Sequence, residues 1–165
     1  MLEEISEFAY DLALEAGRLI AKQRQLGEVH SSYKDKQELV TSADIAADKL
    51  IIEQIKNRFP KHRILSEETY TNTESLKDLS SPIWIIDPID GTVNYAHGHY
   101  MVAISIAYAC DGEVKHGIVH NPFLNETFQA TLGKGAFLNQ KAIQVSHSNS
   151  LRKSLIATGF PYDKS

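Results

Sequence analysis

Two aspartates three positions apart, Asp87 and Asp90, are the residues of this chain best suited to chemistry. They follow an apolar run, Ile83 to Ile86, whose length and β-branched content are typical of a buried strand. Pro88 lies between them and cannot donate to a β-ladder, so pairing is expected to stop there and leave both carboxylates at one strand end. Two like charges ~4 Å apart repel by about 4 kcal/mol at an effective dielectric constant near 20, which favours a bound cation. Hard oxygen donors with no thiolate nearby favour Mg²⁺ over zinc.

The next two residues, Gly91 and Thr92, suggest a phosphate site beside the cation. Asp90 or Thr92 can cap a helical turn, and Gly91 lets a ligand approach the backbone closely. Free N–H groups at the start of a helix attract anions. Carboxylates followed at once by an anion cradle are the layout of a metal-assisted phosphatase. The alternative is an ordinary strand that ends in an Asp-rich turn.

The elements that must position these residues begin with two helices. Apolar residues recur at helical spacing from Leu2 to Ile20, which predicts an amphipathic helix ending near Gly27. A second helix is expected to begin at a cap formed by Ser42 or Asp44 and to end at Pro60. On the residues alone, capping is the expected role of Asp44. Polar loops are expected at 28–38 and 69–81.

The second half of the chain has the pattern of strands. Val102 to Tyr108 alternates, Asp111-Gly112 predicts a hairpin turn, and Val114 to His120 forms the returning strand. Further strands are expected at 127–130 and 142–145. Helices on a mostly antiparallel sheet define an α+β fold.

Two other motifs allow either a functional site or a simpler structural role. Gly133-Lys134-Gly135 is too short for a P-loop and predicts a turn. His97 and His99 lack further zinc ligands at suitable spacing, so His97 is expected to brace the loop behind the Gly-Thr turn.

Three segments together resemble a known family. Leu39-Val40-Thr41-Ser42-Ala43-Asp44 leads into the second helix, Ile64-Leu65-Ser66-Glu67-Glu68-Thr69 is a short strand ending in paired acids, and the aspartate motif runs on to Gly98. In order and spacing the chain resembles the inositol monophosphatase family of Mg²⁺-dependent, lithium-sensitive sugar phosphatases. The family signature is Asp-Pro-Ile/Leu-Asp-Gly-Thr-x-Asn-Phe/Tyr-x-His-Gly, which matches from Asp87 to Gly98. The resemblance implies the N-terminal domain of the αβαβα sugar-phosphatase fold.

The resemblance also implies a role for each matching position. The metal ligands would be one backbone carbonyl and three carboxylates, those of Ile89, Glu67, Asp87 and Asp90. The substrate phosphate would lie against the turn formed by Asp90, Gly91 and Thr92. The catalytic residues that orient and deprotonate the attacking water would be Glu67, Thr92 and Asp44. Lys34 or Lys36 would match a lysine of the loop ahead of the Leu-Val-Thr element.

The chain departs from the family pattern in two places. Ser66 stands where members usually have glycine, and it would be strained if the backbone there needed a positive φ. The family supplies a further metal-binding aspartate from a second domain, in a Trp-Asp element, and no such element follows Gly98. We therefore expect a metal- and phosphate-binding domain over residues 1–150, while 151–165 would begin a C-terminal domain that is otherwise absent.

Composition narrows the class of protein. Of 165 residues, 42% are hydrophobic and 23% charged, which is ordinary globular usage. A net charge of −4 argues against a nucleic-acid partner, and no stretch of about 18 apolar residues predicts a membrane span. The acidic N-terminus is unlike a signal peptide, and the single Cys110 suits a reducing, cytoplasmic compartment.

The sequence thus predicts Mg²⁺-dependent hydrolysis of a small phosphate monoester, with myo-inositol monophosphate as the default substrate and a homodimer as the expected assembly. Three alternatives stay open. The chain could be another phosphatase of the superfamily, acting on fructose 1,6-bisphosphate, a nucleotide 3′-phosphate or NADP. It could bind metal or phosphate without catalysis, or it could be a fragment unable to fold alone.

Overall fold

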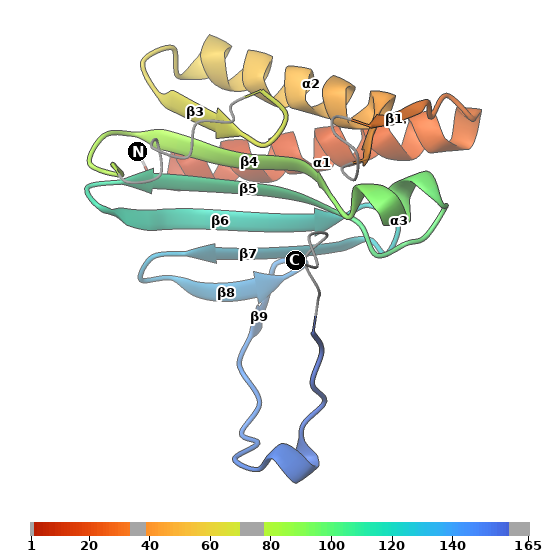
Figure 1. Cartoon of the computed structure of the whole chain (residues 1–165). Coiled ribbons are helices and arrows are strands. Elements are labelled where there is room, and N and C mark those ends of the chain that lie inside the picture. Colours follow the sequence, from red (N-terminus) through yellow and green to blue (C-terminus); the bar gives the residue numbers. More distant parts are fainter. Residues whose placement is uncertain (1, 34–38, 70–77, 159–165) are drawn as a thin grey trace, which may run out of the picture.

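The computed structural model describes residues 2–33, 39–69 and 78–158. Two helices, α1 (Leu2–Leu26) and α2 (Ser42–Arg58), lie side by side and cover one face of a seven-stranded sheet (Figure 1). This arrangement confirms the α+β prediction. Both helix ends agree with the sequence, since α1 ends just before Gly27 and α2 ends two residues before Pro60.

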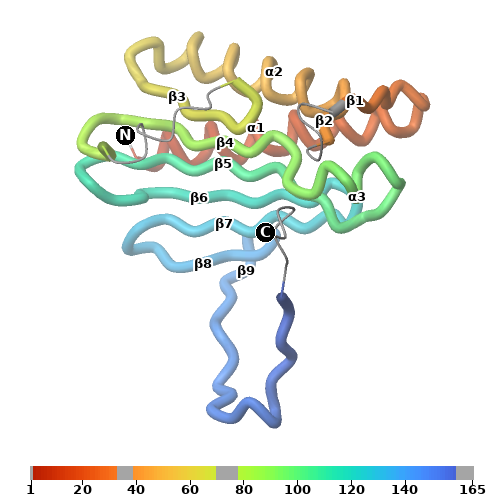
Figure 2. The backbone as a smooth tube through the Cα atoms, viewed as in Figure 1, coloured from red at the N-terminus to blue at the C-terminus, as the bar shows by residue number. Residues whose placement is uncertain are grey.

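The sheet has the strand order β3-β4-β5-β6-β7-β8-β9. Only β3 and β4 pair in parallel, and every other neighbouring pair is antiparallel. The strands are β3 (Arg63–Ser66), β4 (Ile83–Asp90), β5 (Ala103–Cys110), β6 (Glu113–Asn121), β7 (Glu126–Thr131), β8 (Gly135–Leu138) and β9 (Lys141–Ile143). After β9 the chain leaves the sheet in an extended path that includes the 3₁₀ turn η2 (Leu151–Lys153), as the tube in Figure 2 shows.

The turns between the antiparallel strands follow from residues that tolerate a positive φ. Asp111 and Gly112 have φ of 54° and 83°, as a two-residue hairpin turn requires, so the predicted hairpin between β5 and β6 is confirmed. Gly133, at φ 76°, lies in the turn between β7 and β8, where the sequence predicts a turn and not a P-loop.

A small second sheet precedes α2. Strands β1 (Ser31–Tyr33) and β2 (Leu39–Thr41) pair antiparallel, with Ser32 opposite Val40. The prediction of a continuous polar loop over 28–38 was therefore wrong at 31–33. A strand of three polar residues is too short to show a period of two, so only its partner reveals it. The rest of that loop, with Lys34 and Lys36, lies outside the described residues.

The N-cap of α2 is Thr41, and not Ser42 or Asp44 as predicted. Thr41 and Asp44 form a capping box in which Asp44 Oδ2 accepts the Thr41 amide at 2.8 Å. Ser42 is used elsewhere, because its hydroxyl donates to the Glu28 carbonyl at 2.9 Å and accepts the His30 amide at 3.1 Å. Thr41, Ser42 and Asp44 can all act as N-caps, so the sequence alone left the position of the cap ambiguous. The contacts of Ser42 with Glu28 and His30 leave Thr41 as the N-cap.

The core between the helices and the sheet centres on Trp84 of β4, which is fully buried. Its ring packs against Phe8, Phe59 and Tyr108 with centroid distances of 5.7, 5.6 and 5.2 Å. The indole Nε1 donates to His62 Nδ1 at 3.1 Å, so the one polar atom of this ring is satisfied. This cluster anchors the strand that carries the two aspartates.

Strand β4 continues through Pro88 to Asp90, so the prediction that pairing stops at the proline was wrong. Asp87 lies opposite Ser105 and Asp90 lies opposite Ala103, which leaves one extra residue on β4 and marks a β-bulge. Pro88, which has no N–H to donate, sits inside the bulge, where the ladder is interrupted. The extra residue changes the alternation, so two buried positions follow Asp87 in succession.

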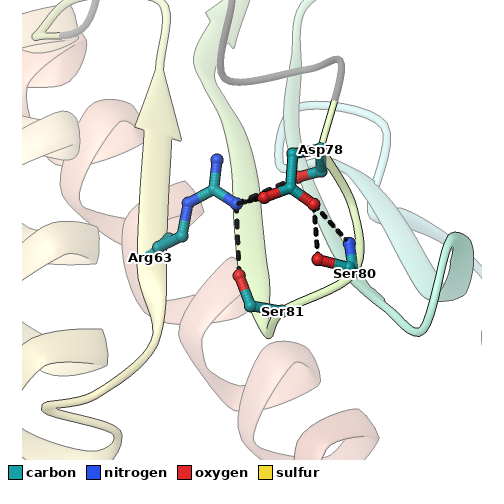
Figure 3. Close-up of polar contacts among 4 residues, drawn as sticks. All are labelled: Arg63, Asp78, Ser80 and Ser81. Atoms are coloured by element: carbon teal, nitrogen blue, oxygen red, sulfur yellow. Dashed lines mark hydrogen bonds and ion pairs between the residues drawn. The ribbon is translucent and has the colours of Figure 1, made fainter.

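The start of β4 is tied to the start of β3 by Arg63. Its guanidinium donates to the Asp78 carbonyl at 2.9 Å and to Ser81 Oγ at 3.2 Å (Figure 3). Asp78 in turn accepts the Ser80 amide at 2.9 Å. These contacts lie at the end of the two parallel strands where Arg63 pairs with Ile83. No helix in the described ranges is long and apolar enough to cross a membrane.

Candidate active site

The site forms around a left-handed glycine at the end of β4. Gly91 has φ 92° and precedes the short helix α3 (Thr92–Ala96) as its N-cap, without a side-chain cap. The predicted cap by Asp90 or Thr92 is therefore wrong. A Cβ on Gly91 would lie 2.8 Å from the Met101 carbonyl oxygen, so both the backbone angle and the space require glycine.

Helix α3 is anchored to α1 at this point. The Tyr95 hydroxyl donates to the Ile20 carbonyl at 2.8 Å, and Arg24 donates to the Tyr95 carbonyl at 2.9 Å. The Arg24 guanidinium also lies 4.4 Å from the centre of the Tyr95 ring and 3.9 Å from that of Phe123. A five-residue helix has little stability of its own, so these contacts hold the Gly-Thr turn in place.

Thr92 and Asp44, two residues for which the resemblance implies a role in catalysis, are hydrogen-bonded to each other. The Thr92 hydroxyl donates to Asp44 Oδ1 at 2.9 Å and lies 3.1 Å from the Ile89 carbonyl oxygen. Asp44 is 1% exposed and uses its other oxygen in the α2 cap, where it accepts the Thr41 amide. Capping and contact with the Gly-Thr turn therefore coexist in one carboxylate.

Glu67 reaches Asp87 through the parallel pairing of β3 with β4. Ser66 pairs with Ile86, and the Glu67 amide donates to the Ile86 carbonyl at 3.1 Å. The next residue on each strand is a carboxylate, so Glu67 and Asp87 lie side by side. The site residues on two segments twenty positions apart are thus brought together by strand register.

The electrostatics of Asp87 are the most unusual feature of the site. Burial and the neighbouring Glu67 carboxylate, with a smaller contribution from Asp90, raise the pKa of Asp87 to about 8. Its Oδ1 is buried without a hydrogen-bond donor among the described residues. A carboxylate pushed this far from its ordinary pKa of 3.8 indicates a position suited to a proton or a cation.

The donors around Asp87 fit a hard cation in kind but are not arranged as a finished site. Carboxylate and carbonyl oxygens are the ligands of Mg²⁺, and Glu67, Asp87, Asp90 and Ile89 provide only oxygen. Over the described ranges, however, no three His, Cys, Asp or Glu side chains stand where they could share one ion. Asp90 is exposed at the end of β4, and the Ile89 carbonyl oxygen lies 3.1 Å from the Thr92 hydroxyl oxygen. The predicted ligands therefore lie near the ends of β3 and β4, but they are not arranged to coordinate one ion.

His97 and Ser66 each make a contact that bears on what the sequence predicts for them. His97 Nδ1 lies 2.8 Å from the Val93 carbonyl oxygen within α3, consistent with the predicted bracing role. Ser66, in place of the usual glycine, is not among the described residues with positive φ, so the substitution brings no backbone strain. Its hydroxyl instead donates to Asp48 of α2.

Sequence reasoning missed two residues of the site's surroundings, Thr41 and Asp48. The Thr-x-x-Asp spacing of a capping box could have identified Thr41. Asp48 is only 5% exposed, and both of its oxygens accept hydroxyl groups, from Ser66 and Thr69. Its one sequence signal is its place a single helical turn after Asp44.

Helices on one face of a mostly antiparallel sheet, with carboxylates and a Gly-Thr turn at the end of β4, place the chain in the class of α+β domains with a polar site at the strand ends. Within this class, a model described as the inositol monophosphatase family matches residues 1–165. The chain belongs to the inositol monophosphatase family.

Known relatives agree with this assignment. Inositol monophosphatase 3 of Solanum lycopersicum is 37% identical over 157 residues, which make up 95% of this chain and 58% of that protein. A Thermotoga maritima protein named fructose-1,6-bisphosphatase/inositol-1-monophosphatase is 42% identical over 132 residues, 80% of this chain and 48% of that protein.

Solved structures have the same fold. The Thermotoga maritima IMPase superposes with a TM-score of 0.77 and 39% identity, covering 88% of this chain and 55% of that one. The extragenic suppressor protein SuhB of Bartonella henselae gives a TM-score of 0.78 and 30% identity with the same two shares of coverage. The chain thus spans about half the length of the relatives it matches.

Proposed function

We propose that this chain carries the metal- and phosphate-binding half of a phosphomonoesterase that hydrolyses a small phosphate monoester with an activated water. The observation that carries the proposal is the half-buried Asp87 carboxylate beside Glu67, with a pKa raised to about 8 and one buried oxygen that has no hydrogen-bond partner among the described residues. Thr92, which donates a hydrogen bond to Asp44, follows two residues after the end of the same strand.

In this proposal the Thr92 hydroxyl and Asp44 handle the proton of the attacking water. Because Thr92 donates its own hydrogen to Asp44 Oδ1, its oxygen is free to accept a hydrogen bond from water. Transfer of the water proton to Thr92, with the Thr92 proton passing to Asp44, would leave hydroxide to attack phosphorus. Glu67 would help to orient the same water. The N–H groups of Gly91 and Thr92 would hold the phosphate oxygens.

Glu67, Asp87, Asp90 and the Ile89 carbonyl would hold Mg²⁺. When bound, Mg²⁺ supplies positive charge that lowers the pKa of water and stabilises the charge of the phosphoryl group. The raised pKa of Asp87 supports this choice of ligands, since a cation would offset the burial and the repulsion from Glu67 that oppose its ionisation. Inhibition by lithium is the corresponding expectation for the whole protein.

For the substrate we propose myo-inositol monophosphate, on the strength of the His97-Gly98 end of the signature and of relatives named inositol monophosphatase. The Thermotoga maritima relative, whose name includes fructose-1,6-bisphosphatase, supports that sugar bisphosphate as the second candidate.

We also propose that residues 151–165 begin a second domain, and that the whole protein is at least a dimer. Described residues of this segment expose large apolar side chains, with Leu155 fully exposed and Ile156 69% exposed. Exposed apolar side chains on an extended segment favour packing against further structure. Light scattering after size exclusion tests the dimer, and a monomer at high concentration would contradict it.

The test is phosphate release from myo-inositol 1-phosphate and from fructose 1,6-bisphosphate, with Mg²⁺ and then with EDTA. The proposal predicts release that requires Mg²⁺, that disappears in Asp87→Asn and that survives in Asp11→Asn, an exposed aspartate on α1. Release that persists in EDTA or in Asp87→Asn would contradict it. Release by the 165-residue chain alone would show that no further metal ligand is essential. If a folded chain binds Mg²⁺ without turnover, it is a binding module by itself.

A further inference from the structure

Helix α2 carries two buried carboxylates, Asp44 and Asp48, one turn apart. They are 1% and 5% exposed, and residues four apart lie on the same face of a helix. Asp44 accepts the Thr92 hydroxyl at the beginning of α3. Asp48 contacts the segment 66–69, which begins with the last residue of β3.

Both oxygens of Asp48 are engaged by that segment. Oδ1 accepts the Ser66 hydroxyl, and Oδ2 accepts the Thr69 hydroxyl. Ser66 directly precedes Glu67, and Thr69 follows it by two positions. Asp48 therefore holds the chain on both sides of Glu67, while the Glu67 amide is bonded to the Ile86 carbonyl of β4 at 3.1 Å.

Burial of a carboxylate is costly unless its oxygens are hydrogen-bonded, and an apolar residue would fill the same space without that cost. The two hydroxyls satisfy Asp48 and at the same time limit where residues 66–69 can move. Glu67 itself is exposed at the end of β3, so neighbouring side chains do not restrain it by packing. Its placement beside Asp87 depends on the backbone that Asp48 holds.

We propose that Asp48 is a positioning residue, which holds the Glu67 carboxylate beside Asp87 through Ser66 and Thr69. With Asp44 it makes α2 a common support that sets the distance between Glu67 and Thr92. The inference rests on the proposed function in one respect, that Glu67 and Asp87 bind a divalent cation. The contact of Asp48 with residues 66–69 does not depend on that function.

The test compares Asp48→Ala, which removes both contacts, with Asp48→Asn. An asparagine can accept the Ser66 hydroxyl through its oxygen and donate to the Thr69 oxygen through its amide, so it keeps the clamp without the charge. Glu53→Ala removes a carboxylate from the exposed face of the same helix and serves as the matched control. Thr69→Val removes one contact at an exposed position and should not prevent folding.

The first readout is the affinity for Mg²⁺, measured by calorimetry without substrate. Loss of a partner that orients a ligand costs about 10- to 100-fold in affinity, so Asp48→Ala should weaken binding at least tenfold. Thr69→Val should weaken it less, and Asp48→Asn should stay close to the unaltered chain. Equal effects of Asp48→Ala and Glu53→Ala would overturn the proposal. So would an equal loss in Asp48→Asn, because the charge and not the clamp would then matter.

The second readout is hydrogen exchange, which needs no metal. In Asp48→Ala the backbone amides of 66–69, including that of Glu67, should exchange faster, while those of β5 stay unchanged. Unchanged exchange at 66–69 would overturn the proposal.

Glu67→Gln separates the two hypotheses. If it weakens Mg²⁺ binding and Asp48→Ala does not, only the role of Asp48 fails. If the unaltered chain binds no Mg²⁺, the proposed function fails, and the exchange experiment decides whether Asp48 holds this segment.

Discussion

Replacing Asp87 by asparagine should stabilise the metal-free protein at high pH, although it removes a residue of the proposed site. Asp87 has a pKa of about 8 in the folded chain and an ordinary value of 3.8 when exposed. The folded protein therefore keeps a proton that the unfolded chain releases. The associated stability is fully present below about pH 4 and is lost as the pH rises through about 8. Asparagine does not ionise, so the variant should escape this loss.

The size of the effect follows from the same shift. Each unit of difference between the two pKa values, 3.8 and about 8, corresponds to ~1.4 kcal/mol. The loss of unfolding free energy caused by ionisation of Asp87 above pH 8 therefore has an upper limit of about 6 kcal/mol. Glu67 is exposed and can move away, so part of the repulsion will relax. The free energy of unfolding of Asp87→Asn should exceed that of the unaltered chain by roughly 2 kcal/mol or more at pH 9, and the two should agree near pH 4.

Denaturant unfolding in EDTA at pH 4, 7 and 9 measures this difference. The fluorescence of Trp84, the only tryptophan and fully buried, reports the transition. Asp11→Asn, at an exposed position of α1, is the matched control and should show no pH-dependent gain. Millimolar Mg²⁺ should stabilise the unaltered chain at pH 8 and leave Asp87→Asn unchanged. A difference that does not grow with pH, or a variant less stable at pH 9, would refute the reasoning.

Three further predictions concern packing and titration. Gly91→Ala should destabilise the fold by about 2–4 kcal/mol, because its Cβ would lie 2.8 Å from the Met101 carbonyl oxygen. Gly112→Ala, with φ 83° and open space around it, should cost about 1 kcal/mol in the same denaturant assay. Equal losses in the two variants would contradict this prediction. Gly17→Ala places a Cβ 2.5 Å from His120 Cδ2 and should lower the melting temperature despite alanine's better helix propensity. A higher melting temperature would mean that the His120 ring can move away at little cost. Burial lowers the pKa of His120 from its ordinary 6.5, so its contribution to the free energy of unfolding is present above pH 6.5 and is lost as the pH falls. In His120→Asn, the free energy of unfolding should therefore decrease less between pH 7 and pH 5. An unchanged pH dependence would exclude His120 as its source.

Local chemistry in the sequence was sufficient for much of this protein. The periodic apolar residues of α1, the Asp111-Gly112 turn and the apolar run of β4 were predicted because each depends on residues close in the chain. The long Asp87-to-Gly98 motif identified the family, which the match over residues 1–165 confirms. The roles of Glu67, Asp87 and their neighbours in catalysis stay predictions.

Long-range pairing decided the rest. The local chemistry of Pro88 predicts that pairing ends there. In the fold, a bulge opposite β5 accommodates the proline, and β4 continues to Asp90. Only the parallel register of β3 with β4 brings Glu67 beside Asp87, where it adds to the effect of burial in raising the pKa of Asp87. Asp48, four residues after Asp44 on an unremarkable helix, gains its contacts only when α2 packs over the end of β3. A pKa and a hydrogen bond between distant segments depend on spatial proximity, which no local pattern encodes.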